Sequence, residues 1–196
     1  MRNKKTVMDS PIGAAFLKQF KVTNVVAGRG HDTGGLICDL HLGSKKIALY
    51  NDNGWGGGAD ITFLKPEYEQ QMTQMLKDVK YQQLMFDTGW DFLDKPEDIG
   101  LHSAIEDVVS LVTQRKQQDK ALKQLDKATL TALVVGTSVD SYTEYFWNYQ
   151  RGGRAPLNKI GKAALQKKYD NLRKKLKKDE KILNSVEQLA SLEVNI

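Results

Sequence analysis

A glycine-rich segment of the chain has the composition of an anion-binding loop. Residues 51–58 read Asn-Asp-Asn-Gly-Trp-Gly-Gly-Gly, and successive backbone N–H groups in such a loop can form a nest for phosphate. The Gly-Lys-Ser/Thr ending of a P-loop is absent, and no helix pattern follows the glycines as the dinucleotide fingerprint requires. A hairpin loop with Trp55 packed over it is the alternative. On the first interpretation, Gly56 and Gly57 contact phosphate.

Three cationic side chains are candidates to assist that loop. Arg29 lies in a second glycine-rich segment, residues 28–35, and a guanidinium is suited to bidentate contact with a phosphate or carboxylate. Lys45 and Lys46 begin the strand-like segment that leads into the first loop. We predict that Arg29, Lys45 and Lys46 hold phosphate together with the loop. The alternative, which the sequence favours, is that residues 28–35 simply connect two strands.

A run of aromatic side chains followed by arginines forms a further candidate site. On a strand, Tyr145, Trp147 and Tyr149 share one face, and Arg151 and Arg154 follow at once. Aromatic faces beside arginines can hold a base and its phosphate, each stacked base contributing about 1–3 kcal/mol. The alternative is a sheet-to-helix core, where aromatic rings usually lie.

Catalytic and metal-binding motifs are incomplete in this sequence. Cys38 and His41 have half the spacing of a zinc site, but on a strand they point to opposite faces. Asp52 and Asp60 are the basis of the weakest alternative, a metal-dependent enzyme without an identifiable nucleophile or general base. We therefore expect a non-enzymatic protein with no metal and no cofactor. A single cysteine also fits a reducing cytoplasm.

Charge is distributed unevenly along the 196 residues. The chain has 29 basic and 24 acidic side chains, a net charge of +5, but residues 66–119 carry −6 and residues 151–196 carry +7. One explanation is that the two segments face each other within one fold or across an oligomer. The other is that the basic end meets phosphate, on a nucleotide or a nucleic acid.

The hydrophobic pattern predicts an α+β fold with two parts. Residues 1–65 form an antiparallel β-rich subdomain, and residues 66–196 form a subdomain of central helices, a β-hairpin and a long C-terminal basic amphipathic helix. The expected strands are 16–26, 36–42, 45–50, 61–64, 129–135 and 142–149, and the expected helices start at residues 66, 101 and 159.

The C-terminal helix is expected to run from about residue 159 to 181. Its apolar residues Leu165, Tyr169, Leu172 and Leu176 are spaced 4, 3 and 4 apart, which is the narrow seam of a coiled coil. The spacing indicates one partner helix, which a second copy of the chain would supply. We therefore expect a homo-oligomer. Lysines cover the rest of this helix and either remain solvated or lie along a nucleic acid.

No part of the sequence resembles a targeting or membrane segment. The basic start is not followed by an apolar run of signal-peptide length, and the longest apolar stretch is far shorter than a membrane span. The expected location is the cytoplasm, without membrane association.

Two stretches, 38–63 and 164–184, resemble a group of small proteins from tailed phages and bacterial genomes. In that group a strand with lysines leads into an Asp-x-Gly-x-Gly-Gly loop, which Asp52, Gly54, Gly56 and Gly57 match here. The resemblance implies a phage accessory protein that counters a host defence protein, or sequesters an anionic nucleotide signal, in the host cytoplasm. The alternative function is a nucleic-acid-binding module that uses the C-terminal helix.

Overall fold

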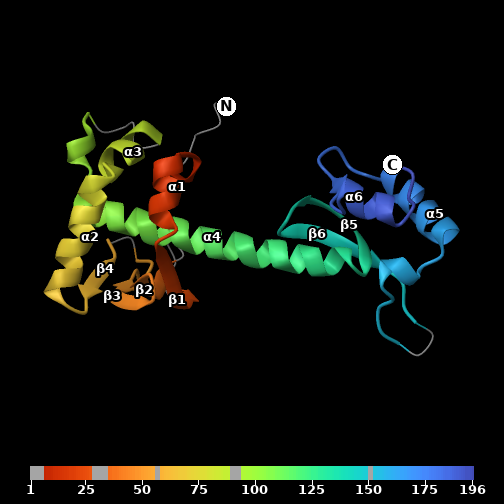
Figure 1. Ribbon diagram of the computed structural model, residues 1–196, viewed down its shortest axis with the longest axis horizontal. Coiled ribbons are helices and arrows are strands. Elements are labelled where there is room, and N and C mark those ends of the chain that lie inside the picture. The colour runs from red at the N-terminus through yellow and green to blue at the C-terminus, as the bar shows by residue number, and fades with distance from the viewer. Residues whose placement is uncertain (1–6, 28–34, 56–57, 89–93, 150–151) are drawn as a thin grey trace. The chain divides into compact units, whose positions relative to one another are not determined.

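The chain folds into two compact units, residues 1–116 and 117–196. The computed structural model describes residues 7–27, 35–55, 58–88, 94–149 and 152–196 (Figure 1). Two antiparallel sheets and several helices confirm the α+β class. The boundary predicted after residue 65 lies inside the first unit, where helices share one hydrophobic core with the sheet.

Unit 1 is built on a four-stranded antiparallel meander. Its strands, in spatial order, are β1 (Phe20–Ala27), β2 (Leu36–Leu42), β3 (Lys45–Asn51) and β4 (Asp60–Phe63). The predicted hairpin between β2 and β3 is confirmed, and Gly43 occupies its turn at φ +60°, a conformation that glycine adopts without steric cost.

The first predicted strand begins later than the hydrophobic pattern suggested. A short 3-10 helix η1 (Val7–Asp9) and helix α1 (Pro11–Leu17) precede β1. The Ser10 hydroxyl accepts a hydrogen bond from the Gly13 N–H at 3.4 Å, and Pro11 occupies the first helical position. Serine followed by proline is a helix-start signal that outweighs the β-branched residues downstream.

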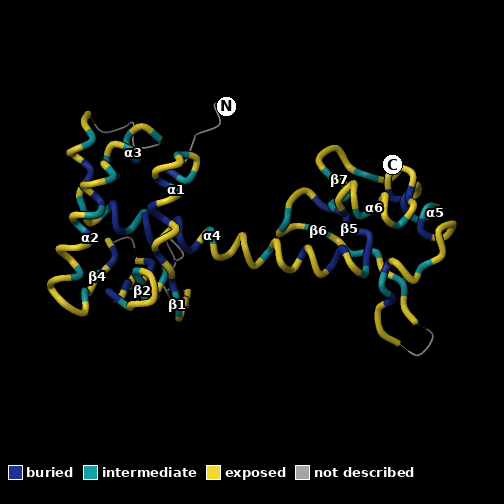
Figure 2. Tube along the Cα trace, in the orientation of Figure 1, coloured by how far each residue is buried: buried dark blue, intermediate teal, exposed yellow. Residues whose placement is uncertain are grey.

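Helices cover one face of the unit 1 sheet. They are α2 (Pro66–Asp78), α3 (Tyr81–Thr88) and the start of α4 (Leu101–Thr129), with the 3-10 turn η2 (Pro96–Asp98) before α4. The apolar pattern from Pro66 to Leu84 belongs to two helices rather than one, because Lys80 adopts φ +51° between them. The inward-facing residues appear dark blue in Figure 2.

Unit 2 contains the end of α4 and a three-stranded sheet in the order β6-β5-β7. The strands are β5 (Ala132–Ser138), β6 (Ser141–Phe146) and β7 (Lys181–Ile182). The predicted hairpin of β5 and β6 is confirmed, as is the helix from Leu101 through Leu125. The turn η3 (Leu157–Lys159) and helices α5 (Lys162–Arg173) and α6 (Val186–Ser191) complete the unit.

The prediction of a long C-terminal helix is wrong. Helix α5 ends at Arg173, and the long helix of the chain is the central α4. Beyond Arg173, continued helix would place like charges four residues apart, Arg173 with Lys177 and Lys174 with Lys178, which is unfavourable. The segment turns instead, and Ile182 pairs with Val135 of β5.

The apolar seam of α5 is occupied inside unit 2. Leu165, Tyr169 and Leu172 are buried in one cluster with Leu133 of β5 and Leu189 of α6. The partner surface is therefore the unit's own sheet and last helix. The seam gives no support to a second copy of the chain, and the homo-oligomer remains a prediction.

A buried asparagine fastens the C-terminal segment to this sheet. The Asn184 side-chain oxygen accepts a hydrogen bond from Val134 N–H at 2.8 Å, and its amide nitrogen donates to Ala132 O at 3.0 Å and Thr129 O at 3.3 Å. Asn184 is 5% exposed. Its amide supplies a donor and an acceptor to backbone groups of the central strand β5, beyond the residues that pair with the short β7, and to the last residue of α4.

Candidate anion-binding site

The residues predicted to bind phosphate and base are divided between the two units. Lys45 and Lys46 belong to unit 1, whereas Tyr145, Trp147, Tyr149 and Arg154 belong to unit 2. Four further candidates lie outside the described residues: Arg29, Gly56, Gly57 and Arg151.

The two lysines of unit 1 have different surroundings. Lys46 Nζ forms an ion pair with Asp39 at 2.8 Å, and the hydrogen bond from Lys46 lowers the pKa of that carboxyl. Lys45 lines a shallow cavity of about 590 Å³ together with Gln19, Tyr68 and Gln71. Lys46 is thus occupied within the fold, and Lys45 faces a mostly neutral lining.

In the described part of the glycine-rich loop, two backbone N–H groups donate hydrogen bonds to side chains of the loop itself. The Asp52 carboxylate accepts a hydrogen bond from Gly54 N–H at 2.8 Å, and the Asn53 side chain accepts one from Trp55 N–H at 3.0 Å. These are Asx-type turns, which fix a loop without a ligand. Trp55 is 59% exposed.

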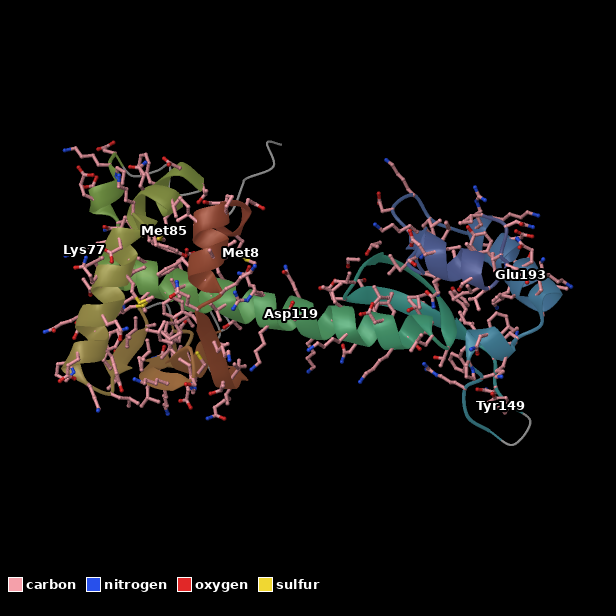
Figure 3. All side chains as sticks on the ribbon, in the orientation of Figure 1. Met8, Lys77, Met85, Asp119, Tyr149 and Glu193 are labelled. Carbon is pink, nitrogen blue, oxygen red and sulfur yellow. The ribbon has the colours of Figure 1, made fainter. Side chains whose placement is uncertain are left out.

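The two faces of β6 and the residues just after it differ in burial. Tyr145 and Trp147 are partly buried against the unit 2 core, whereas Phe146 is 42% exposed on the other face. Tyr149 is 50% exposed and lies beyond β6, apart from the C-terminal segment that carries Glu193 (Figure 3). Of the predicted stacking residues, Tyr145 and Trp147 therefore also contribute to the core, as the alternative interpretation required.

Arg154 is held on the face of β6 opposite Tyr145. It forms an ion pair with Glu144, and its guanidinium carbon lies 4.2 Å from the centroid of the Phe146 ring. Glu144 and Phe146 share the strand face that Tyr145 does not. The structure therefore does not bring Arg154 and Tyr145 to one side of the strand.

Tyr145 instead meets the basic face of α5. A pocket of about 280 Å³ is lined by apolar and polar side chains of β5, β6, α5 and the turn after it: Val135, Tyr145, Lys168, Asn171, Leu172, Lys175, Leu176 and Glu180. Lys168 Nζ lies 5.1 Å from the centroid of the Tyr145 ring, within the range of a cation–π interaction. The pocket thus combines an aromatic ring, an amide and two ammonium groups.

The carboxylate of this pocket is fixed by the turn after α5. Glu180 Oε2 accepts a hydrogen bond from Lys177 N–H at 3.0 Å. The second carboxylate oxygen remains available as an acceptor at the pocket wall. An occupant that suits the pocket therefore carries an anionic group for the lysines and a hydroxyl or amino donor for Glu180.

Positive charge in this part of unit 2 is largely uncompensated. Nine basic residues lie between Lys162 and Lys181, against three acidic ones. Among the residues that the structure describes, Lys162 is the member of this set that forms a salt bridge, with Glu193 at 2.8 Å. The exposed ammonium groups beyond it contact solvent, so an external anion meets them without breaking internal pairs.

The described residues offer no metal centre. No group of three or more His, Cys, Asp or Glu side chains within them is placed to hold an ion. Cys38 is buried, and burial raises the pKa of its thiol to about 11, so it is protonated and unreactive near neutral pH. His41 Nε2 lies 2.9 Å from Thr23 Oγ1.

Sequence reasoning missed Lys168, Asn171 and Lys175 as a group. They follow each other at i, i+3 and i+7, the spacing of one helical face, directly beside the apolar seam. The spacing of these three residues can be seen in the sequence. Their position beside Tyr145 cannot, because it depends on how α5 packs on β6.

Comparison of the chain with protein-family models, with curated proteins and with solved structures returned no match. Over the described residues, no helix is long and apolar enough to span a membrane.

Proposed function

We propose that this protein is a non-enzymatic binding protein whose second unit holds a phosphate-bearing ligand of the nucleotide class. The ligand occupies the pocket between β6 and α5, and the protein acts by sequestration. The observation that carries this proposal is the convergence of Lys168, Lys175 and Tyr145 on one pocket. The resemblance to phage proteins adds the proposal that the sequestered ligand is a signal of host defence in the host cytoplasm.

The chemistry of a nucleotide matches each part of the pocket. Its phosphate accepts charge-assisted hydrogen bonds from Lys168 and Lys175, which are stronger than neutral ones. A base or ribose presents an apolar face to Tyr145 and a donor to the Glu180 carboxylate. Inorganic phosphate alone is attracted by the lysines but repelled by the Glu180 carboxylate. A ligand that also donates a hydrogen bond to Glu180 therefore binds more tightly.

Calorimetric titration with adenosine triphosphate, adenosine and pyrophosphate tests the proposal. We expect the triphosphate to bind more tightly than either fragment. Lys168→Gln with Lys175→Gln should weaken binding by about 100-fold or more, since two charge-assisted hydrogen bonds at about 1.5–3 kcal/mol each are lost. Lys167→Gln is the matched control, because Lys167 lies on the same helix but outside the pocket. Equal affinity of the double variant and the wild type would refute the proposal.

Nucleic-acid binding is the second candidate function, favoured by the exposed basic residues that follow the pocket. Arg173, Lys174, Lys177 and Lys178 are exposed, and none lines the pocket. Contacts from such residues to a phosphate backbone make the affinity fall steeply with salt. A gel-shift titration of single-stranded DNA at rising salt measures this. Replacing these four residues by Gln should abolish a nucleic-acid shift while leaving triphosphate binding intact.

A further inference from the structure

The two edges of the unit 1 sheet are treated differently by the fold. At the β1 edge, the carbonyl oxygens of Phe20 and Val22 accept hydrogen bonds at 3.0 Å from Arg115 Nη2 and Lys116 Nζ, respectively. Both cations come from α4, and they satisfy backbone groups that would otherwise be available to another strand. Such coverage is one of the ways in which proteins protect an edge strand.

At the β4 edge, α4 contacts the residue just before the strand, and none of the described residues pairs with the outer side of the strand itself. Just before β4, the Ala59 N–H donates to Glu106 Oε1 at 2.7 Å, and His102 Nε2 lies 2.8 Å from Ala59 O. Backbone groups of alternate residues point to the same side of a strand, so the next ones at this edge are those of Ile61 and Phe63. They have no partner among the described residues of the chain.

A groove runs along this open edge. Its volume is about 510 Å³, and its walls come from β4, α2 and α4. The apolar part of the lining consists of Ile61, Phe63, Leu64, Pro66, Leu101 and Ile105. Leu64 remains 47% exposed. The groove therefore places unpaired backbone groups beside apolar surface, which is the combination that captures an extended peptide.

We propose that this groove binds an extended basic peptide of another protein, which adds a strand beside β4. The peptide backbone pairs with Ile61 and Phe63, and its alternate side chains enter the groove. Charge favours a basic peptide: Glu69 lines the groove and Glu67 lies in the same first turn of α2, whereas Lys65, which also lines the groove, has its Nζ 5.8 Å from the centroid of the Tyr68 ring. This site lies in unit 1 and is independent of the ligand pocket.

Amide hydrogen exchange of the full chain tests the proposal, with a blocked peptide of about eight alternating valine and lysine residues as the probe. In the free chain, the Ile61 and Phe63 amides should exchange rapidly while Thr62, which faces β3, is protected. The peptide should slow exchange at Ile61 and Phe63 by about tenfold or more. Protection of both amides in the free chain, or no change on peptide addition, would overturn the proposal.

Two variants and an N-methylated control peptide test whether binding depends on backbone pairing with β4. Ile61→Pro removes the outward N–H without touching the ladder to β3, a position where an edge strand tolerates proline, and it should abolish peptide binding. Ile61→Val keeps the N–H and should bind within about threefold of the wild type. A peptide N-methylated at alternate amides should not bind, even if the proline variant fails to fold.

The same experiments distinguish a basic peptide from two other possible occupants, an acidic peptide and a second copy of the chain. A peptide of alternating valine and glutamate should bind about tenfold more weakly than the lysine peptide; equal affinity contradicts the charge argument. Concentration-dependent dimerisation that protects Ile61 and Phe63 would show that a second copy of the chain occupies the edge, and would overturn the peptide proposal.

Discussion

The cations that unit 1 pairs within its own fold contrast with the two lysines that line the pocket of unit 2. Unit 1 has 14 basic and 15 acidic residues, and unit 2 has 15 and 9. In unit 1, Lys46 pairs with Asp39, and Arg115 and Lys116 bind the edge of the sheet. In unit 2, Lys168 and Lys175 line a pocket without an ion pair among the described residues. Internal partners, rather than net charge, therefore distinguish structural cations from candidate binding residues.

The units also differ in the size of their cores. Over the described residues, one cluster of 22 buried side chains stabilises unit 1, whereas clusters of 8 and 4 serve unit 2. Unit 2 therefore depends more on specific hydrogen bonds, since less apolar surface is removed from water there.

The largest expected effect follows from this dependence. Asn184→Ala should lower the free energy of unfolding of unit 2 by about 3 kcal/mol, because buried backbone donors and acceptors lose their partners. Urea denaturation measures this by tryptophan fluorescence in a Trp55→Phe, Trp90→Phe background, in which Trp147 of unit 2 is the remaining tryptophan. Asn195→Ala, at an exposed position, should stay within about 0.5 kcal/mol of the wild type. Similar losses in both variants would contradict the assigned role of Asn184.

A second prediction concerns the protected edge of unit 1. Arg115→Ala combined with Lys116→Ala leaves the Phe20 and Val22 carbonyl oxygens without donors. We expect a loss of about 2 kcal/mol in stability, since hydrogen bonds from charged donors are involved. An exposed edge also favours strand pairing between molecules. Sedimentation velocity should show concentration-dependent association of the variant. A variant that remains monomeric at every concentration would show that these cations are not needed to protect the edge.

Arg154 provides a smaller test of the division between structural and binding cations. Its ion pair with Glu144 is exposed, and such pairs contribute about 0–1 kcal/mol. Arg154→Ala should therefore cost less than about 1 kcal/mol in stability and leave the affinity for adenosine triphosphate unchanged. Loss of the affinity would return Arg154 to the binding site that the sequence predicted.

The smallest expected effect is a pH dependence of the stability of unit 1. Tyr81 donates a hydrogen bond to Asp107 Oδ2 at 2.8 Å, and burial nevertheless raises the pKa of the Asp107 carboxyl. The folded chain then binds a proton more tightly than the unfolded chain does. This contribution to stability is complete at low pH and is lost as pH rises from about 4, the ordinary carboxyl pKa, toward the raised value.

Asp107→Asn keeps an oxygen that accepts the Tyr81 hydrogen bond and removes the ionisation. The stability of the variant should change less between about pH 4 and pH 7 than that of the wild type. Urea midpoints of unit 1 measured across this range by circular dichroism test the prediction. Parallel pH profiles would show that Asp107 does not titrate differently in the folded chain.

Local patterns predicted much of the fold. Alternation predicts β2, the Gly43-Ser44 turn after it predicts that β3 follows in a hairpin, and helical spacing predicts α4. The errors arose where tertiary contacts outweighed periodicity. The spacing from Leu165 to Leu176 predicts a continuous helix, but pairing of Ile182 with β5 and burial of Asn184 favour a turn after Arg173.

The candidate site was predictable only in part. Tyr145 was recognised from the aromatic run, and the basic segment of α5 from its lysines. Their meeting depends on packing between β6 and α5, which lie far apart in the sequence. Arg154 follows Tyr145 closely in the chain, yet it binds Glu144 on the opposite strand face. Proximity in sequence was therefore a poor guide to which cation would accompany the ring.

The most direct test of the central claim is amide NMR of the full chain titrated with adenosine triphosphate, which reports where the ligand binds. The account predicts shift changes that begin at Tyr145 and at the α5 residues Lys168 and Asn171, with none at Lys45 or Gly54. Shift changes confined to Lys45 and the glycine-rich loop, or no changes at any residue, would contradict it.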